Sequence, residues 1–396
     1  MFLLLPLLTE SALCQAVFNG SLDLVAGGGG REAQFVTTEM PNSFYHGHFA
    51  LQEFHLTAFA PAGEYFSVEA ELRVDSWGDG RIHSPKLGFA SFNYTPDPGL
   101  FHFSLGRIIT PFGRENQKIY PFQRTFVTRP LAYTWFLNLS ETKGYWPSAG
   151  DSGSYPTDDV GVTTLGYQNL STGMRADWIL SPGAWDLTLA LTDATPSADR
   201  EWTTQFSYAA TAVIGWHLSE RVTHHLSASW GSWMSQDPAL EPLLGNPTKY
   251  RQTLVGLDAT YRLTPIEIVW EAVGSKWNAP RYADTSFVPV GPGGTTPAST
   301  VPALLTGYVD VKWAVSEAHK GYVAGRWDML RPLKMNDPGD GSSTIWDSGV
   351  NRWSFAFGWA LADQVYTKLS YSNQTLNDEI GQTHDWTLRV LLSVVF

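Results

Sequence analysis

The chain has little of what most folds use for cross-linking or for crossing a membrane with helices. Its 396 residues include one cysteine, Cys14, so we expect neither a disulfide framework nor a cysteine-based metal or haem site. No run of 18 apolar residues occurs beyond the N-terminus, and the mean hydropathy of -0.15 is too polar for a helical membrane protein. Charged residues are also scarce, at 16% against about 25% in a typical soluble domain.

Several classes of function lack their sequence signals as well. The net charge of -12 argues against a nucleic-acid binder, which would carry a basic face. Gly27 to Gly30 is not followed by the Gly-Lys-Ser or Gly-Lys-Thr of a phosphate-binding loop. Carboxylate pairs such as Glu69 with Glu71 arise by default in a polar lining, so we predict no catalytic residue, metal or cofactor, and the chain is not expected to be an enzyme.

Aromatic residues, in contrast, are abundant. They make up 14% of the chain, with 17 Trp, 16 Tyr and 21 Phe. Much aromatic surface combined with a polar average is typical of a β-barrel wall that is apolar outside and polar inside.

The last eleven residues show the pattern of a membrane-crossing strand. Bulky apolar side chains fall at Trp386, Leu388 and every second position up to the final Phe396, while the other face carries Arg389 and small polar residues. About ten residues suffice to cross a bilayer as a tilted strand. We therefore expect this strand to pair with the first strand, near residues 17–26, and to place Arg389 in a polar lumen. An edge strand of a soluble protein is the alternative.

Similar alternating segments recur along the chain, separated by turn signals. The segments are 17–26, 47–60, 65–76, 86–94, 99–109, 159–168, 172–181, 185–194, 205–216, 221–232, 249–263, 265–276, 302–315, 319–329, 350–361, 364–375 and 384–396. Short and long connections alternate, and a barrel of this kind needs an even number of strands. Counting 128–137 as a further crossing gives 18 strands, whereas leaving it in a loop and dropping one weak segment gives 16. The predicted fold class is an all-β, transmembrane, up-and-down antiparallel β-barrel with long extracellular loops and short periplasmic turns.

The N-terminus resembles a secretory signal. Residues 1–16 contain a Leu-rich stretch followed by Cys14-Gln15-Ala16, with small residues at the positions that precede a cleavage site after Ala16. The usual basic start is missing, so the signal either begins upstream or is only partly included. Lipidation of Cys14 is a weaker alternative, because Leu13 is a poor residue before a lipidated cysteine. We predict a cleaved signal peptide and a single barrel over 17–396.

A basic cluster follows the fifth predicted strand. It contains five cations and one acid: Arg107, Arg114, Glu115, Lys118, Arg124 and Arg129. A long loop within 110–158 has room to fold inward, where these residues would form a constriction that admits anions. The equally weighted alternative is that they face solvent or lipopolysaccharide. Alternation places Arg107 on the outer side with Leu105, so it reaches the lumen only through a bulge near Gly106, or else it sits at the rim.

Short motifs in this region resemble the phosphate-selective porin family. They are Gly106-Arg107 with Thr110-Pro111-Phe112-Gly113, then Arg129-Pro130-Leu131, Val160-Gly161-Val162 and Trp185-Asp186-Leu187. The resemblance implies a water-filled barrel with an inward constriction loop, commonly assembled as a trimer. The lysine-rich lining of that family is absent here, so phosphate specificity is not implied.

Alternation also assigns a set of charges to the lumen, because a charge on the lipid face would cost roughly 2 to 4 kcal/mol at the bilayer midplane. The predicted lining comprises Glu69, Glu71, Arg73, Asp258, Glu267, Glu271, Asp310, Lys312, Arg326, Lys368 and Arg389. Both signs are present. We expect them to compensate one another and to wet the lumen.

These features predict an outer-membrane porin of a Gram-negative bacterium, which lets small hydrophilic solutes or ions diffuse passively, with a preference for anions. The expected partners are membrane lipid and lipopolysaccharide, the barrel-assembly machinery through the strand that ends at Phe396, small solutes, and two further copies in a homotrimer. The alternative is a structural or binding barrel that houses a partner such as a multihaem cytochrome. A hydrolase would need a Ser and His pair at the outer rim, and spacing identifies none.

Overall fold

The computed structural model describes residues 16–30, 48–75, 84–140, 144–145, 162–166, 170–198, 208–234, 249–280, 299–336, 343–377 and 382–396. The predicted signal peptide, except for Ala16, lies outside these residues. Among the described residues, no helix is long and apolar enough to cross a bilayer.

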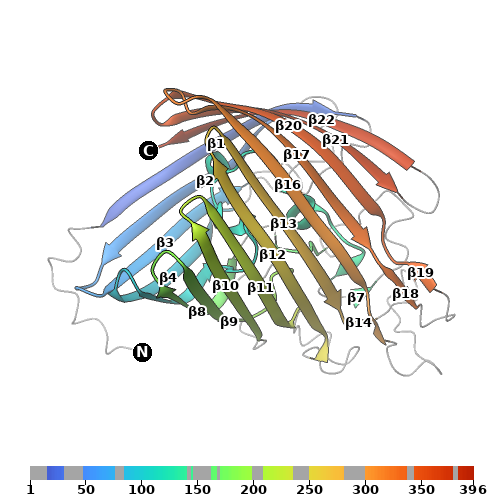
Figure 1. The fold of residues 1–396 in the computed structure, drawn as a ribbon, viewed down its shortest axis with the longest axis horizontal. Coiled ribbons are helices and arrows are strands. Elements are labelled where there is room, and N and C mark those ends of the chain that lie inside the picture. The colour runs from blue at the N-terminus through green and yellow to red at the C-terminus, as the bar shows by residue number, and fades with distance from the viewer. Residues whose placement is uncertain are drawn as a thin grey trace.

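Sixteen antiparallel strands form one closed barrel (Figure 1). They are β1 (Val17–Gly29), β2 (His48–Pro61), β3 (Phe66–Asp75), β4 (Lys86–Asp97), β5 (Phe101–Ile109), β8 (Leu170–Ser181), β9 (Trp185–Thr192), β10 (Ala209–Ser219), β11 (Val222–Ser232), β12 (Arg251–Leu263), β13 (Ile266–Trp277), β16 (Ala303–Ser316), β17 (Gly321–Pro332), β20 (Gly349–Ala362), β21 (Val365–Asn377) and β22 (Gln382–Val395). Each strand pairs with its neighbours in chain order. The predicted fold class is confirmed, at the lower of the two strand numbers.

Short accessory elements occupy the connections. They are the two-stranded pairs β6 (Leu139–Ser140) with β7 (Gly144–Tyr145), β14 (Ala279–Pro280) with β15 (Ser299–Thr300), and β18 (Lys334–Asn336) with β19 (Ser343–Ile345), and the single turns η4 (Glu115–Gln117), η5 (Pro121–Gln123) and α2 (Leu131–Thr134).

One predicted strand is wrong. Residues 162–166, inside the predicted segment 159–168, form no strand, and their backbone bonds to the loop that follows β5 instead: Leu137 N–H donates to the Val162 carbonyl over 2.9 Å. Residues 128–137 do not cross the membrane either, because α2 lies among them. Alternation of apolar residues here reflects packing inside the lumen rather than a lipid-facing side.

Alternation elsewhere separates the two faces of the wall. In β20, Trp353, Phe355 and Phe357 are exposed on the outside, whereas Ser354 and Ala356 are buried. The last strand behaves as predicted: Trp386, Leu388 and Val390 point outward, and Arg389 and Ser393 are buried inside.

The first and last strands close the barrel. Ser21 to Gly29 of β1 pairs with Val395 to Thr387 of β22, and the Gly20 N–H donates to the Phe396 carbonyl over 2.8 Å. This is the predicted closing pair, and it removes the free edges that an open sheet would expose.

The two rims differ in the length of their connections. Seven turns of two to four residues join β2 to β3, β4 to β5, β8 to β9, β10 to β11, β12 to β13, β16 to β17 and β20 to β21. Because the strands are antiparallel, these turns lie at one rim with Val17 and Phe396. The connections at the other rim are longer, apart from the four residues between β21 and β22. We call the two rims the short-turn rim and the long-loop rim.

Candidate functional site

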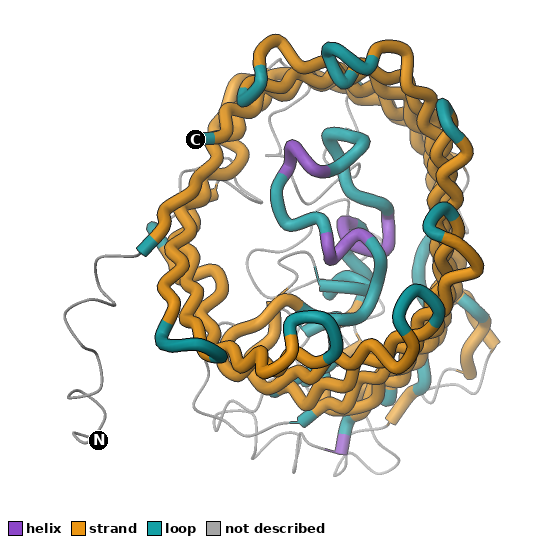
Figure 2. The backbone as a smooth tube through the Cα atoms, turned by 60° about the vertical axis from the view of Figure 1, so that its left-hand side comes forward, coloured by secondary structure: helices purple, strands orange, loops and turns teal. Residues whose placement is uncertain are grey.

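The lumen contains a folded segment of the chain, which we call the inward loop (residues 110–140). It leaves the wall after Ile109 and runs inside the barrel through η4, η5 and α2 (Figure 2). Gly113, with φ of +88°, turns the chain where an added Cβ would lie 2.4 Å from the Tyr133 hydroxyl. Only glycine combines this φ with such a close approach.

Three buried cations of the wall hold the inward loop by its backbone. The Arg326 Nη1 donates to the Thr128 carbonyl over 2.9 Å and the Arg352 Nη2 to the Arg129 carbonyl over 2.5 Å. The Lys368 Nζ donates to the carbonyls of Pro121 and Phe122 over 2.6 and 3.0 Å, and also to that of Arg124. We call Arg326, Arg352 and Lys368 the carbonyl clamp. Hydrogen bonds from a charged donor are about twice as strong as neutral ones, so the clamp fixes the loop firmly.

Two members of the clamp are neutralised by buried carboxylates. Arg326 donates to both oxygens of Asp310 over 2.6 and 2.7 Å, and Arg352 donates to Asp328 over 2.7 Å. Asp328 also accepts the backbone N–H of Leu131 over 3.1 Å. These ion pairs therefore serve the docking of the loop rather than a wet lining.

Glu271 of β13 supplies an anionic anchor. It accepts the backbone N–H of Arg114 over 2.5 Å and the Tyr133 hydroxyl over 2.8 Å. Burial, and the negative charge of Glu271, raise the pKa of Tyr133 well above its usual value, so the hydroxyl remains a donor. Phe112 and Tyr133 pack beside it in a buried cluster with Leu254, Val273 and Tyr308.

Next to the carbonyl clamp, the inward loop also rests against β21 and β2. The Tyr120 hydroxyl hydrogen-bonds to Thr57 Oγ1 over 3.0 Å, and the Phe122 ring stacks on Tyr366. Beneath it, His55 lies 2.7 Å from Glu53 and 3.1 Å from Glu71, in a fully buried network that includes Arg73. The inward loop therefore contacts one continuous part of the wall, from β13 through β22 and β1 to β2.

Of the six predicted constriction residues, Glu115, Lys118, Arg124 and Arg129 lie on the inward loop and are turned toward other parts of the protein. Lys118 is 2.9 Å from Glu115, Arg124 is 3.6 Å from Glu53, and Arg129 lies over the Tyr133 ring. Burial alone would raise the pKa of Glu115, but the positive charges of Lys118, Arg326 and Arg129 outweigh it and lower the pKa to about 2.

Arg107 and Arg114 differ from the other four. Arg107 is buried, although Leu105 two residues earlier is exposed on the outer face. Between them Gly106 has φ of +133°, so the alternation breaks at this glycine. The Arg114 guanidinium is partly accessible and has no hydrogen-bond or ion-pair partner among the described residues, because only its backbone N–H is engaged.

The eleven predicted lining residues fall into two groups. Glu69, Glu267 and Lys312 are partly accessible. The buried group comprises Glu71, Arg73, Asp258, Glu271, Asp310, Arg326, Lys368 and Arg389. Within it, Glu271, Asp310, Arg326 and Lys368 contact the inward loop directly or through an ion pair.

The accessible polar side chains concentrate on another sector of the lumen, which we call the accessible wall (lumen-facing residues of β8 to β12 near the short-turn rim). Arg175 and Asp177 of β8 are 22% and 27% exposed and lie 2.9 Å apart. His217 and Asp186 are each 30% exposed and lie 2.6 Å apart, and His225 is 2.8 Å from Asp258. Water therefore reaches this sector while the docking face of the inward loop is dry.

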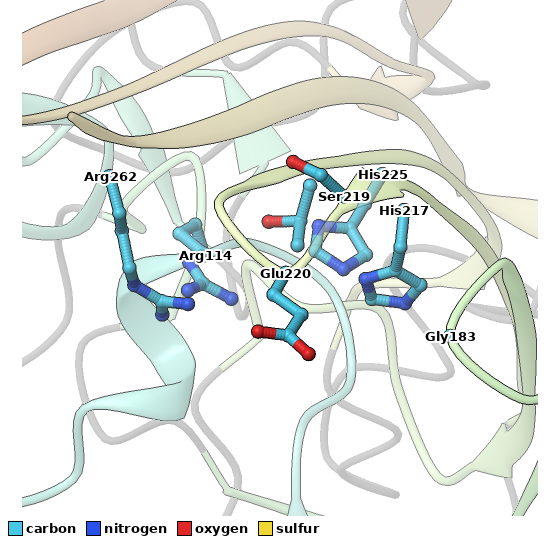
Figure 3. Close-up of a pocket in the computed structure, with 8 residues that line it drawn as sticks. Arg114, Gly183, His217, Ser219, Glu220, His225 and Arg262 are labelled. Carbon is cyan, nitrogen blue, oxygen red and sulfur yellow. The ribbon is translucent and has the colours of Figure 1, made fainter.

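A pocket of about 340 Å³ lies between the accessible wall and the inward loop (Figure 3). Its lining residues are Arg114, Gly183, His217, Ser219, Glu220, Thr223, His225 and Arg262. Gly183 and Glu220 belong to short turns, so the pocket opens toward the short-turn rim. The sequence prediction missed His217, Glu220 and Arg262, although alternation along β10 places His217 on the lumen side with Thr211 and Val213.

The long-loop rim is lined by apolar residues instead. A buried cluster there combines Trp135, Leu137 and Tyr145 with side chains from the ends of the surrounding strands: Trp233, Met234, Tyr250, Trp277, Leu304, Leu330, Trp346 and Val350. Asp347 lies at its border and accepts the backbone N–H groups of Asn138 and Ser348. Burial raises the pKa of Asp347 to about 7. Among the described residues, no group of three or more His, Cys, Asp or Glu side chains is placed to hold a metal ion.

No family model and no curated protein matches the chain. Solved structures do. The outer membrane channel DcaP of Acinetobacter baumannii aligns with a TM-score of 0.57 at 12% identity, covering 96% of this chain and 97% of that one. An anion-selective porin from Comamonas acidovorans aligns at 0.56 and 9% (96% and 99% covered), and a loop-deleted OmpT of Vibrio cholerae at 0.54 and 9% (96% and 99%). At these identities the likeness establishes the fold: the chain has the 16-stranded barrel architecture of porins.

Proposed function

We propose that the protein is an outer-membrane porin, a water-filled channel through which small hydrophilic solutes diffuse passively. The observation that carries the proposal is the one-sided lumen, in which the inward loop docks dry against one part of the wall and leaves the accessible wall wet. A barrel of 16 to 18 strands is wide enough for an aqueous channel, and a loop inside it narrows that channel. The apolar, aromatic outer face fits the hydrocarbon of a bilayer.

An anion preference is the finer part of the proposal. Lys118 and Arg124 face carboxylates, whereas the Arg114 guanidinium faces the pocket with no acidic partner among the described residues. An uncompensated cation beside the path raises the local concentration of anions, whatever the net charge of the whole chain. Within the basic cluster, Arg114 is thus the residue best placed to favour anions over cations.

The alternative of a barrel that houses a partner protein fits less well. The inward loop occupies the lumen and is bonded to the wall at several strands, through the carbonyl clamp on β17 to β21 and through Tyr120 to β2. A partner threaded through the barrel would have to displace these buried contacts.

Orientation, assembly and subunit number complete the proposal. The short-turn rim, with Phe396, is assigned to the periplasm, because barrels of this class have short periplasmic turns. We expect the barrel-assembly machinery to recognise the strand that ends at Phe396. The homotrimer implied by the resemblance to phosphate-selective porins is tested by the native mass of the extracted protein.

Reconstitution in a planar bilayer tests the function. We expect discrete single-channel steps and, in a salt gradient, a reversal potential of the sign given by a mobile anion. An absence of conductance from correctly folded protein would reject the porin. Selectivity for cations would leave the channel in place and reject the role of Arg114.

A further inference from the structure

We propose that the pocket between the accessible wall and the inward loop is a binding site for a small oxyanion, held between the guanidinium groups of Arg114 and Arg262. The site would slow an anion's passage at the short-turn end of the lumen. The inference rests on the proposed channel function and deepens it by assigning a solute class to one place.

The two arginines reach the pocket from independent parts of the fold. Arg114 comes from the inward loop, where Glu271 fixes its backbone N–H, and Arg262 comes from the end of β12. In Figure 3 their guanidinium groups lie on one side of the pocket and the rings of His217 and His225 on the other. The docked loop brings the two arginines together, so the site is a product of the fold and not a chance cluster of surface charges.

Neither guanidinium is strongly committed to an acid. Arg114 has no side-chain partner among the described residues, and Arg262 is 3.8 Å from Glu267, with both side chains substantially exposed. Exposed ion pairs at such a distance contribute little, so Arg262 can turn to a ligand at small cost. The planar fork of a guanidinium matches the two oxygens of a carboxylate or a phosphate.

The two histidines form the side of the pocket opposite the arginines. Asp186 engages Nε2 of His217 over 2.6 Å, and Asp258 engages Nδ1 of His225 over 2.8 Å. The carboxylates fix the ring positions, and the hydroxyl of Thr223 adds a neutral donor in the lining. The pocket therefore offers charged and neutral donors around a volume that suits a small anion.

Among the described residues that line the pocket, Glu220 is the one acid. Its carboxylate projects from the turn between β10 and β11 into the space between the arginines and the histidines (Figure 3). It competes with an incoming anion for the guanidinium groups. A site with such a competitor binds weakly and releases quickly, as a channel requires.

Block of chloride current by added anions tests the site. Succinate and inorganic phosphate are titrated separately into planar bilayers that contain the full chain, and the concentration for half-maximal block is measured for each. We expect Arg114→Gln and Arg262→Gln each to raise that concentration about tenfold, the effect of losing one charge-assisted contact. Glu220→Gln should lower it. Lys320→Gln, which removes a cation from another short turn of the same rim, should leave it unchanged.

The outcomes separate the two proposals. Protein that folds but never conducts rejects the porin itself. Conductance without block by either anion, or block that Arg114→Gln and Arg262→Gln leave unaltered, rejects the site and keeps the porin. Block by succinate alone assigns the site to carboxylates, and block by phosphate alone assigns it to phosphate.

Discussion

Arg326 connects the wall, the inward loop and an acidic partner with a single guanidinium group. It is bidentate to Asp310, donates to the Thr128 carbonyl and lies 4.3 Å from the Phe126 ring centroid. Both charged side chains are buried. A buried pair adds modest net stability as a pair, yet the loss of one partner leaves a charge without compensation.

We therefore expect Asp310→Asn to lower the free energy of unfolding by about 3 kcal/mol. Urea unfolding of the barrel in lipid vesicles, followed by tryptophan fluorescence, measures it. Glu267→Gln is the matched control, because Glu267 lies on the lumen side in the neighbouring strand and its ion pair with Arg262, at 3.8 Å, is exposed. Its change should stay below about 1 kcal/mol. Equal losses in the two variants would contradict the role of the buried pair.

Glu115 gives the inward loop a dependence on pH. Its pKa of about 2 in the folded protein lies below the ordinary value of 4.5. Ionised Glu115 thus stabilises the fold above about pH 4.5, and this contribution disappears as the pH falls from 4.5 toward 2. Glu115→Gln should cost on the order of 3 kcal/mol at pH 7 and almost nothing near pH 2.

Unfolding of parent and variant at pH 7, 4 and 2 measures the difference. Glu317→Gln, in an exposed turn, serves as the control and should stay within about 0.5 kcal/mol at each pH. A penalty for Glu115→Gln that does not shrink in acid would refute the electrostatic explanation.

At the scale of elements, the sequence predicts the strands of the wall better than it predicts the inward loop. Alternation identified the last strand because its outer face is continuously apolar, from Trp386 to Phe396, and its inner face carries Arg389. The same pattern misled at 159–168, where Val162 is apolar because it belongs to a buried cluster with Leu139 and Trp135. A period of two reports which face is apolar, but it does not distinguish lipid from a buried interior.

The candidate site was less predictable for a different reason. Alternation correctly turned Arg326 inward, but its acceptor on Thr128 is 198 residues away, and no local pattern relates the two. The sequence shows that basic residues cluster here, but it does not show their partners. The path of the loop after Gly113 brings Lys118 to Glu115 and leaves Arg114 facing a pocket.

Excision of part of the inward loop tests its role as the element that narrows the lumen. Replacing residues 115–128 by a short Gly-Ser linker removes η4 and η5 but leaves the sixteen-strand ladder intact, since the barrel's backbone hydrogen bonds run between strands. We expect a larger single-channel conductance and a weaker ion preference.

Heat-dependent migration in a denaturing gel confirms that the excised barrel still folds. The substitution Lys368→Met, which removes one member of the carbonyl clamp, should give an intermediate result with noisier current. An unchanged conductance after excision would mean that the loop does not limit the path.

For the molecule as a whole, pairing between β1 and β22 closes the barrel and leaves no free sheet edge. Asp23 and Ser393 hydrogen-bond across this seam inside the lumen, and Val25 packs with Leu391 and Val127 of the inward loop. The seam thus joins the two ends of the chain, and the loop covers part of it.

Cysteines placed at Ala26 and Val390, which pair directly across the seam, should cross-link in the folded protein. The expected result is a shift in migration on a non-reducing gel after full unfolding in urea. Ala26→Cys combined with Leu369→Cys, one strand further along, should not cross-link. Failure of the first pair to join would contradict the closed register.

The carbonyl clamp has a consequence for how the interior can vary. Arg326, Arg352 and Lys368 bind main-chain oxygens, which every residue carries, so these three contacts do not depend on which side chains the loop has there. Substitutions at an accessible loop position such as Arg114, of which only the backbone N–H is engaged, can then change the solutes admitted while the wall continues to hold the loop. Selectivity in such a barrel can evolve, or be engineered, with little loss of stability.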